Sequence, residues 1–492
     1  MKKIIILLAL CVSFSSCLDL DPKKYEVINS SIFPQNKADA EALVVAAAYG
    51  TFRCSHYDGI FNCASGIQVV SDLSTDLGEC LWDDSVWGPL LYHYWTPDYS
   101  YTNRFYSSYI KDFSKMILAE YRIADVEMSD DERNLLLAEL NLAKGWLGYL
   151  LYDFYGPVPI PTLNELLDPL QEIIISRPTK EWMVSFIEES LKNAALYLPA
   201  RYDAGDSNYG RFTKGLAYTI LMKLYMHEQD WTRAEAIGRE LEKPEYGYEL
   251  VTNYKDIFTL ENEKNREIIF AVQEDRGVSQ QLWLAHVLPD TYPTKNPAIQ
   301  KWNGFRVPWT FFHTYENNDK RLDVLISSYR GTDGILYNES NKDQYYSLSK
   351  GVIPLKYGED PAATGEESQV DWIVYRYADV LTLLSEAIVR QAGVTQEAID
   401  LLNKIRSRAG LSSYMVTDFN SVEEFLDALL LERGHEFFFE GMRRSDLIRH
   451  SKYIEYARKK GSTTTKDEFV LMPIPQSVIN ESKGLILQNP GY

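Results

Sequence analysis

Two pairs of amphipathic segments constrain the fold of this chain more than any other feature. In residues 215–227, apolar side chains recur at three- and four-residue steps, and a second such run follows Gln229 and ends at Pro244. The same layout returns at 377–388 and 398–410. This spacing places the apolar side chains on one face of a helix. We therefore predict two helical hairpins.

Residues 134–155 and 179–198 show the same helical period and supply a third pair. Pairs of this kind stack side by side in tetratricopeptide-like repeats, where each unit buries the apolar face of its neighbour. We predict a mainly α fold, a tetratricopeptide-like helical-repeat scaffold that forms an α-α superhelix. An ordinary bundle of unrelated amphipathic helices stays open as the alternative.

Residues 56–103 and 275–370 lack this period and are rich in Gly, Pro, Asn and Asp. They are far longer than ordinary connections, and long loops within a compact domain are usually functional. We expect them to build a large irregular, loop-rich lobe that binds the ligand, with a few short strands such as 267–272. Because no Pro-, Gly- and Ser-rich linker divides the chain, residues 17–492 are predicted to be a single domain.

The start of the chain has the layout of an exported lipoprotein. Lys2 and Lys3 precede a short apolar run, as in a secretory signal peptide. Two serines stand directly before Cys17, and acidic residues follow it. We predict that residues 1–16 are a signal peptide and that Cys17 is lipidated, which would anchor the protein to a membrane surface. A plain signal peptide with an incidental cysteine is the alternative.

Charge and cysteine content exclude several classes of protein. The formal net charge of −20 repels phosphate backbones, so we expect no nucleic-acid partner and a weak preference for neutral ligands. Cys54, Cys63 and Cys80 cannot all pair with one another, and the sequence leaves open which two, if any, form a bridge. We find no zinc-ligand spacing, P-loop or dinucleotide-binding glycine pattern, so we expect neither a metal nor a cofactor.

Two clusters of aromatic residues mark the candidate binding surface. Residues 82–109 hold ten aromatic side chains, and residues 283–315 hold eight. Many of them must pack in the core, but exposed Trp and Tyr rings can stack on the flat C–H faces of sugars while polar neighbours bind the hydroxyls. The predicted ligand-binding residues are Trp82, Tyr94, Trp95, Tyr99, Asn103, Trp283, Trp302, Arg306 and Trp309.

A helical glycoside hydrolase is an alternative of a different class. Such an enzyme needs two carboxylates about 5 to 10 Å apart across the scissile bond. The chain has 70 acidic residues, so a pair of this kind is easy to imagine, but no spacing in the sequence identifies one.

Residues 432–449 combine charged side chains with three consecutive phenylalanines. Because three successive residues sweep about 200° around a helix, this segment must be covered on more than one side. Glu440 stands three and four residues before Arg443 and Arg444, which predicts ion pairing within one helix. We interpret these charges as a buried structural strut rather than a catalytic group.

Several stretches together resemble the SusD/RagB-like outer-membrane nutrient-binding lipoproteins of Bacteroidetes. They are the lipoprotein start at Cys17 and the segments 145–161, 375–410, 432–450 and 471–492, which begin GWLGY, YRYAD, ERGHE and LMPIP. The resemblance implies a tetratricopeptide-like scaffold and a lipid-anchored position on the outside of the outer membrane. It also implies a non-catalytic protein that captures glycans, or in some cases oligopeptides, over a SusC-like TonB-dependent transporter.

Overall fold

The computed structural model describes residues 33–55, 58–168 and 174–492. The predicted signal peptide 1–16 and Cys17 lie outside the described residues, so both stay predictions. Among the described helices, none is both long and apolar enough to cross a membrane.

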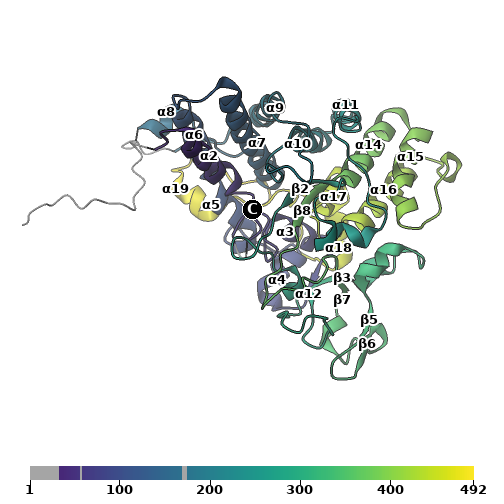
Figure 1. Ribbon diagram of the computed structural model, residues 1–492. Helices are drawn as coiled ribbons and strands as arrows, with labels where there is room; N and C mark the ends of the chain where they lie inside the picture. Colours follow the sequence, from purple (N-terminus) through teal and green to yellow (C-terminus); the bar gives the residue numbers. More distant parts are fainter. Residues whose placement is uncertain (1–32, 56–57, 169–173) are drawn as a thin grey trace, which may run out of the picture.

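A row of packed helices forms one layer of the molecule, along the top in Figure 1. Each helix of the row packs on the next, and α11 packs on α14, so the two predicted hairpins lie side by side. This arrangement confirms the helical-repeat scaffold. The row consists of α6 (Asp112–Ile123), α7 (Asp130–Tyr155), α9 (Lys180–Ala195), α10 (Lys214–His227), α11 (Trp231–Leu241), α14 (Tyr377–Ala392) and α15 (Gln396–Arg408). α2 (Lys37–Val44), the π-helix Val45–Tyr49 and α8 (Leu163–Leu167) complete its α6 end.

Local sequence signals set the ends and the spacing of these helices. Ser129 and Glu132 form a capping box at the start of α7, which satisfies backbone N–H groups that the first turn leaves free. Gly393, with φ of +78°, ends α14. Gly238 lets α11 approach α14, because a Cβ there would lie 3.0 Å from Leu384 Cδ1.

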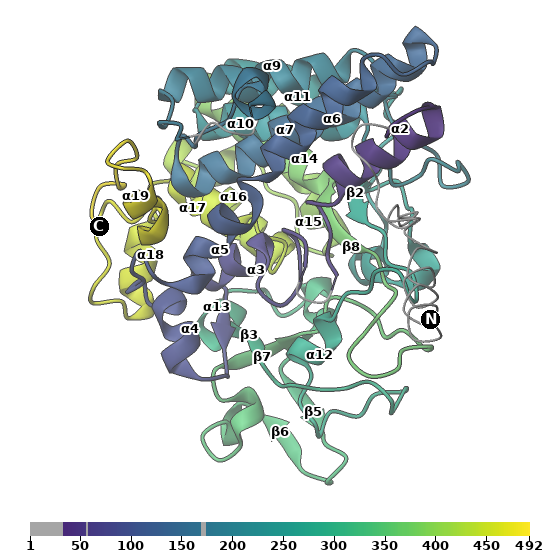
Figure 2. The same cartoon turned by 90° about the vertical axis from the view of Figure 1, so that its left-hand side faces the viewer.

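The second layer is the predicted irregular lobe, which lies below the helices in Figure 2. Its centre is an antiparallel sheet of strand order β1-β3-β7-β4, in which Glu79 pairs with Arg306 and Val307 pairs with Val352. The sheet therefore joins the two long segments that the sequence analysis singled out. Its strands are β1 (Glu79–Cys80), β3 (Phe305–Pro308), β7 (Gly351–Pro354) and β4 (Leu325–Ile326); the hairpin of β5 (Ser328–Arg330) and β6 (Leu336–Asn338) projects from the lobe.

The lobe contains more helix than the sequence analysis predicted. Segment 56–103 holds α3 (Ile67–Leu73), α4 (Asp84–Leu91) and the start of α5 (Ser100–Tyr109). Segment 275–370 holds α12 (Trp283–Val287) and α13 (Trp309–Phe312). Helices this short show little periodicity and depend on tertiary packing for their stability, so the pattern in the sequence missed them.

A buried two-stranded sheet connects the lobe to the helical row. β2 (Ile268–Val272) pairs antiparallel with β8 (Trp372–Arg376), which runs directly into α14. Every residue of both strands is buried. The predicted strand 267–272 is confirmed to within one residue.

The C-terminal helices cross beneath the row and carry the charged motif. They are α16 (Val422–Phe437), α17 (Arg443–Arg449), α18 (Tyr453–Lys460) and α19 (Gln476–Glu481). The phenylalanines at 437–439 are all buried, as predicted. The expected pairing of Glu440 with Arg443 and Arg444 is wrong. Glu440 pairs with Arg376 and Lys356 instead, because the chain leaves the helix after Phe437 and the helical spacing no longer applies.

We call the buried charges at this crossing the ionic junction. At its centre, Arg376 donates to Glu440 at 2.7 Å, to Glu267 at 2.8 Å and to Glu436. Arg408 also binds Glu267, at 2.8 Å. These residues come from β8, α15, α16, the turn after α16 and the segment before β2, so the ionic junction links the helical row, the C-terminal helices and the lobe.

Candidate functional site

Two predicted ligand-binding side chains are buried inside the lobe. Trp283 and Arg306 have no exposed surface. The indole N–H of Trp283 donates to the Pro354 carbonyl at 3.0 Å. The Arg306 guanidinium donates to the carbonyls of Val287 and Ser347, both at 2.8 Å. A side chain without exposed surface cannot contact a sugar, so in this structure both residues support the lobe.

Trp95 and Asn103 also take part in packing. Trp95 is 3% exposed, its indole N–H donates to the Tyr492 hydroxyl at 2.7 Å, and its ring stacks on Phe469. Asn103 is half-buried, and its amide donates to the Pro97 carbonyl at 2.5 Å. The Trp95 contacts hold the C-terminal residue against the lobe.

Four predicted residues keep exposed surface. Trp82 and Trp302 are half-buried and connect the two aromatic clusters, since the Trp82 indole N–H donates to the Trp302 carbonyl at 2.7 Å. Tyr99 is half-buried, with its hydroxyl on the Val86 carbonyl at 2.8 Å. Tyr94 is 43% exposed. For these residues, contact with a ligand stays a prediction.

The ninth residue, Trp309, is 7% exposed, and its indole N–H donates to the Leu348 carbonyl at 2.8 Å. Its remaining surface lines an open cleft of about 550 Å³, a volume typical of ligand sites. Tyr92 follows α4, Trp309 and Phe311 belong to α13, and Tyr456 belongs to α18, so both aromatic clusters meet a C-terminal helix here. We call this site the aromatic cleft. Its other lining residues are Asp76, Glu79, Pro308, Thr310, Thr314, Lys350, Lys459 and Lys460.

One buried carboxylate in the wall of the aromatic cleft lacks a partner. Glu79 is 8% exposed, and its Oε2 has no hydrogen-bond partner among the described residues. Its Oε1 lies 3.9 Å from Lys460 Nζ, but that ammonium donates to the carbonyls of Thr75 at 2.9 Å and Leu73 at 3.2 Å. An unpartnered buried acceptor costs about 1 to 3 kcal/mol, so a donor from a ligand would stabilise this arrangement.

Neighbouring charges in the aromatic cleft are held in place by the protein. Lys350 donates to Asp84 at 2.6 Å. Burial disfavours its charge, but this hydrogen bond and the nearby charges of Glu79 and Asp84 together raise the pKa of Lys350. Asp76 accepts two hydrogen bonds from Arg443, at 2.8 and 2.9 Å. Burial lowers the pKa of Lys460. Because these side chains are already fixed, the cleft is preorganised, and binding needs little ordering of its walls.

The predicted ligand-binding residues did not include Glu79, Lys350 or Tyr456. Glu79 reaches the site through the pairing of β1 with β3, which joins residues more than two hundred positions apart. Tyr456 follows the buried Tyr453 by three residues on α18 and faces the cleft from the C-terminal part of the chain. A lone tyrosine in a charged helix gives no signal of its own in the sequence.

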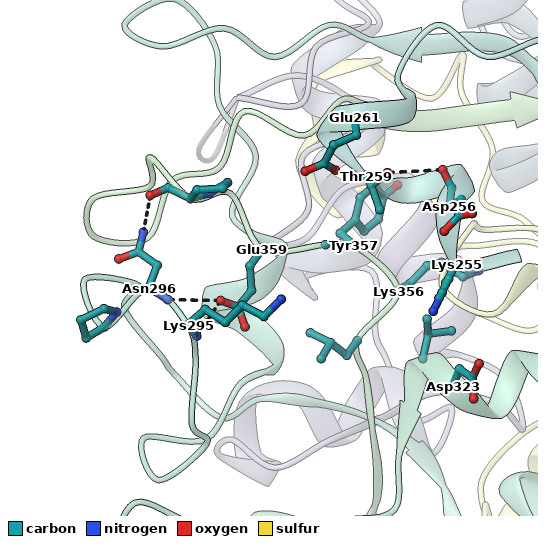
Figure 3. A pocket seen from close by; sticks show the side chains of 15 residues that line it. Lys255, Asp256, Thr259, Glu261, Lys295, Asn296, Asp323, Lys356, Tyr357 and Glu359 are labelled. Atoms are coloured by element: carbon teal, nitrogen blue, oxygen red, sulfur yellow. Dashed lines mark hydrogen bonds between the residues drawn. The ribbon is translucent and has the colours of Figure 1, made fainter. Parts of the chain in front are cut away.

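A second hollow, of about 720 Å³, lies elsewhere in the lobe and differs in chemistry. Figure 3 shows Lys295 and Glu359 at one end and Lys255 and Asp256 at the other. We call it the charged hollow. Its aromatic lining residue, Tyr357, is buried and stacks on a neighbouring ring, so it offers no open face. Although the charged hollow is larger, the aromatic cleft is the better match for a sugar.

A metal site is not part of either hollow. Within 33–55, 58–168 and 174–492, no group of three or more His, Cys, Asp or Glu side chains is arranged to hold a metal ion.

Two family models match most of the chain. One, described as the SusD family, matches residues 323–492, and the other, described as "Starch-binding associating with outer membrane", matches residues 31–226. The chain belongs to the SusD family. Residues 227–322 lie outside both matches and contain Trp309 and Phe311. One wall of the aromatic cleft therefore comes from the part of this SusD-family protein that neither family model covers.

Individual relatives are distant in sequence but similar over their full length. The chain is 22% identical to the starch-binding protein SusD of Bacteroides thetaiotaomicron, with 89% of this chain and 86% of that protein covered. A surface glycan-binding protein A from the same species, solved in complex with laminarihexaose, superposes with a TM-score of 0.74 at 21% identity and covers 92% of this chain and 100% of its own. A SusD superfamily protein from Parabacteroides distasonis gives 0.78 at 19% identity, covering 93% and 99%. These structures show that the fold is shared.

Proposed function

We propose that this SusD-family protein is a cell-surface lipoprotein that binds an oligo- or polysaccharide in the aromatic cleft. It passes the glycan to a SusC-like TonB-dependent transporter and carries out no catalysis itself. The observation that carries the proposal is the combination of the half-buried Tyr92 and Tyr456 rings with the unpaired oxygen of Glu79. Rings match the C–H faces of a sugar, and a carboxylate is a strong acceptor for its hydroxyls.

The names of two similar proteins support this ligand class. One is a starch-binding protein, and the other is a surface glycan-binding protein that was solved with laminarihexaose. The anchor and the transporter partner rest on the lipoprotein-like start at Cys17 and on the family resemblance.

The expected affinity at one site is modest. Each stacked ring contributes about 1 kcal/mol beyond the area it buries. A protein fixed to the cell surface gains more from a polymer, because many equivalent segments of one chain can engage neighbouring copies of the protein. The proposal therefore favours long glycans over short ones as ligands.

Isothermal titration of the purified protein against a panel of neutral and acidic polysaccharides tests the proposal. We expect binding to at least one neutral glycan, and a roughly five- to tenfold weaker affinity after Tyr92→Ala or Tyr456→Ala, as expected for the loss of one stacked ring. Trp182→Ala is the matched control, because Trp182 is a 46%-exposed ring on α9 of the helical row.

Two other results would replace the proposal. If no glycan binds and a mixed oligopeptide panel does, the ligand is a peptide, and the charged hollow with its lysines and carboxylates becomes the first site to mutate. If the purified protein releases reducing ends from a glycan that it binds, it is a hydrolase, and the statement that it carries out no catalysis is wrong.

A further inference from the structure

Two buried cysteines lie together where the lobe meets α12. Cys54 and Cys63 have no exposed surface and are free thiols in this structure. Burial and then the neighbouring Cys63 raise the pKa of the Cys54 thiol, so the two thiols lie close together. Cys80, the third free cysteine among the described residues, lies instead near Lys350 and Glu79. The structure thus places Cys54 and Cys63 together and Cys80 apart from them. The sequence left open which two of the three cysteines could pair.

The backbone holds the two cysteines close. The Phe61 N–H donates to the carbonyl of Arg53 at 3.1 Å; Arg53 adjoins Cys54, and Phe61 stands two residues before Cys63. Gly59, with φ of +86°, permits this approach, because a Cβ there would lie 2.0 Å from the Arg53 carbonyl oxygen. This approach of Phe61 to Arg53 brings the backbone on either side of Cys54 and Cys63 together.

Cys63 faces two groups that stabilise a thiolate. The Leu282 N–H donates to Cys63 Sγ at 2.9 Å. His286 Nδ1 donates to the Leu282 carbonyl at 2.8 Å, which fixes the orientation of the ring. Burial alone would raise the pKa of the Cys63 thiol, but hydrogen bonds with Cys54 and His286 lower it to about 5. A thiolate is the nucleophile in thiol–disulfide exchange.

We propose that Cys54 and Cys63 are a redox pair that closes to an intramolecular disulfide when the protein meets a disulfide-bearing oxidant. The Cys63 thiolate attacks one sulfur of the oxidant and expels its first thiolate, giving a mixed disulfide. Cys54 then attacks Cys63 Sγ, expels the second thiolate and completes the bridge. The chain loses two electrons and two protons, and the oxidant takes up both as it becomes two thiols.

The bridge would be easier to reduce than an ordinary structural disulfide. The Leu282 N–H and His286 favour the Cys63 thiolate, and stabilising the reduced form makes a disulfide more oxidising. Because both sulfurs are buried, exchange takes place during folding or during local unfolding that exposes Cys63. This inference is independent of glycan binding.

Thiol counting in glutathione buffers tests the proposal. The full chain is incubated both folded and during refolding, quenched, alkylated under denaturing conditions, and mapped by mass spectrometry at positions 54, 63 and 80. With oxidised glutathione, we expect free thiols at these positions to fall from three to one, with a peptide that links Cys54 to Cys63. The wild-type melting temperature should drop when dithiothreitol is added, and that of the Cys54→Ser, Cys63→Ser double variant should not.

Cys80→Ser is the matched control, because Cys80 is equally buried but lies apart from the pair. It should form the same linked peptide as the wild type. Three free thiols after oxidative refolding, or a linked peptide that contains Cys80, would overturn the proposal.

Discussion

The ionic junction and the aromatic cleft both contain buried carboxylates, but these carboxylates differ in whether the protein supplies hydrogen-bond partners for both oxygens. In the ionic junction, Glu440 accepts from Arg376 on both of its oxygens, and Arg376 donates from all three of its nitrogens. In the aromatic cleft, Glu79 is almost as buried but keeps one oxygen without a partner among the described residues. The ionic junction holds parts of the chain together, whereas the aromatic cleft retains an acceptor that the protein itself leaves unsatisfied.

This difference separates effects on stability from effects on binding. Removing one partner of a buried pair leaves an uncompensated charge and destabilises the fold. Changing an acceptor that has no partner in the protein leaves the fold almost unchanged and reduces only the affinity for a ligand. The following variants test this distinction, from the largest expected effect to the smallest.

Arg376→Met should destabilise the protein by about 3 to 5 kcal/mol, because it leaves Glu267, Glu436 and Glu440 with less positive charge around them. The free energy of unfolding in urea measures the effect. Arg239→Met is the control, since Arg239 is 45% exposed and pairs at the surface, where such a pair contributes about 0 to 1 kcal/mol. Equal losses in the two variants would contradict the structural role of the ionic junction.

Asp379→Asn should lower stability by an amount that depends on pH. Burial opposes ionisation of Asp379, but Lys223 and Arg433 hold its pKa down to about 2, below the ordinary aspartate value of 3.8. A carboxyl with a depressed pKa contributes stability that is present above its unfolded pKa and is lost as the pH falls through its folded pKa. The difference between wild type and variant should be on the order of 2 kcal/mol at pH 6 and should shrink between about pH 4 and 2. If the stability difference between wild type and variant stayed constant across this pH range, the charge of Asp379 would not contribute to stability.

Glu79→Gln should weaken glycan binding about tenfold and leave the melting temperature nearly unchanged, because a charged acceptor is replaced by a neutral one of the same shape. Titration of wild type and variant with the same glycan measures the change. Glu261→Gln in the charged hollow is the matched control and should have no effect on affinity. A large loss of stability in Glu79→Gln would mean that Glu79 belongs to the fold, as the ionic junction does.

Tyr94→Ala should have the smallest effect, at most about 1 kcal/mol on affinity and little on stability. Tyr94 is exposed, and its hydroxyl donates to the Asp84 carbonyl at 3.3 Å, beside the Lys350 ion pair at the edge of the aromatic cleft. A glycan that extends past Lys350 would touch it. An affinity loss as large as that of Tyr456→Ala would extend the binding site to this edge.

The aromatic cleft was only partly predictable. Aromatic enrichment selected two segments that contribute to its lining, and Trp309 lines it as a predicted residue. The same enrichment also selected Trp283, which is buried. An aromatic side chain looks the same in a sequence whether it packs inward or outward, because burial depends on neighbours that are far away along the chain. Nothing in the sequence marked Glu79 as a residue of the cleft, since its place there depends on its pairing with Arg306 in the sheet.

The sequence by itself determined the helical row, because a period of 3.6 residues and the capping residues act within a few turns of one helix. It also determined that a C-terminal motif so rich in charge and phenylalanine must be buried. Only the tertiary structure decided which charges pair, since the turn after Phe437 directs Glu440 to Arg376 rather than to its neighbours in the sequence. It likewise decided which rings face solvent and which two cysteines meet, because both depend on contacts between segments that the sequence keeps far apart.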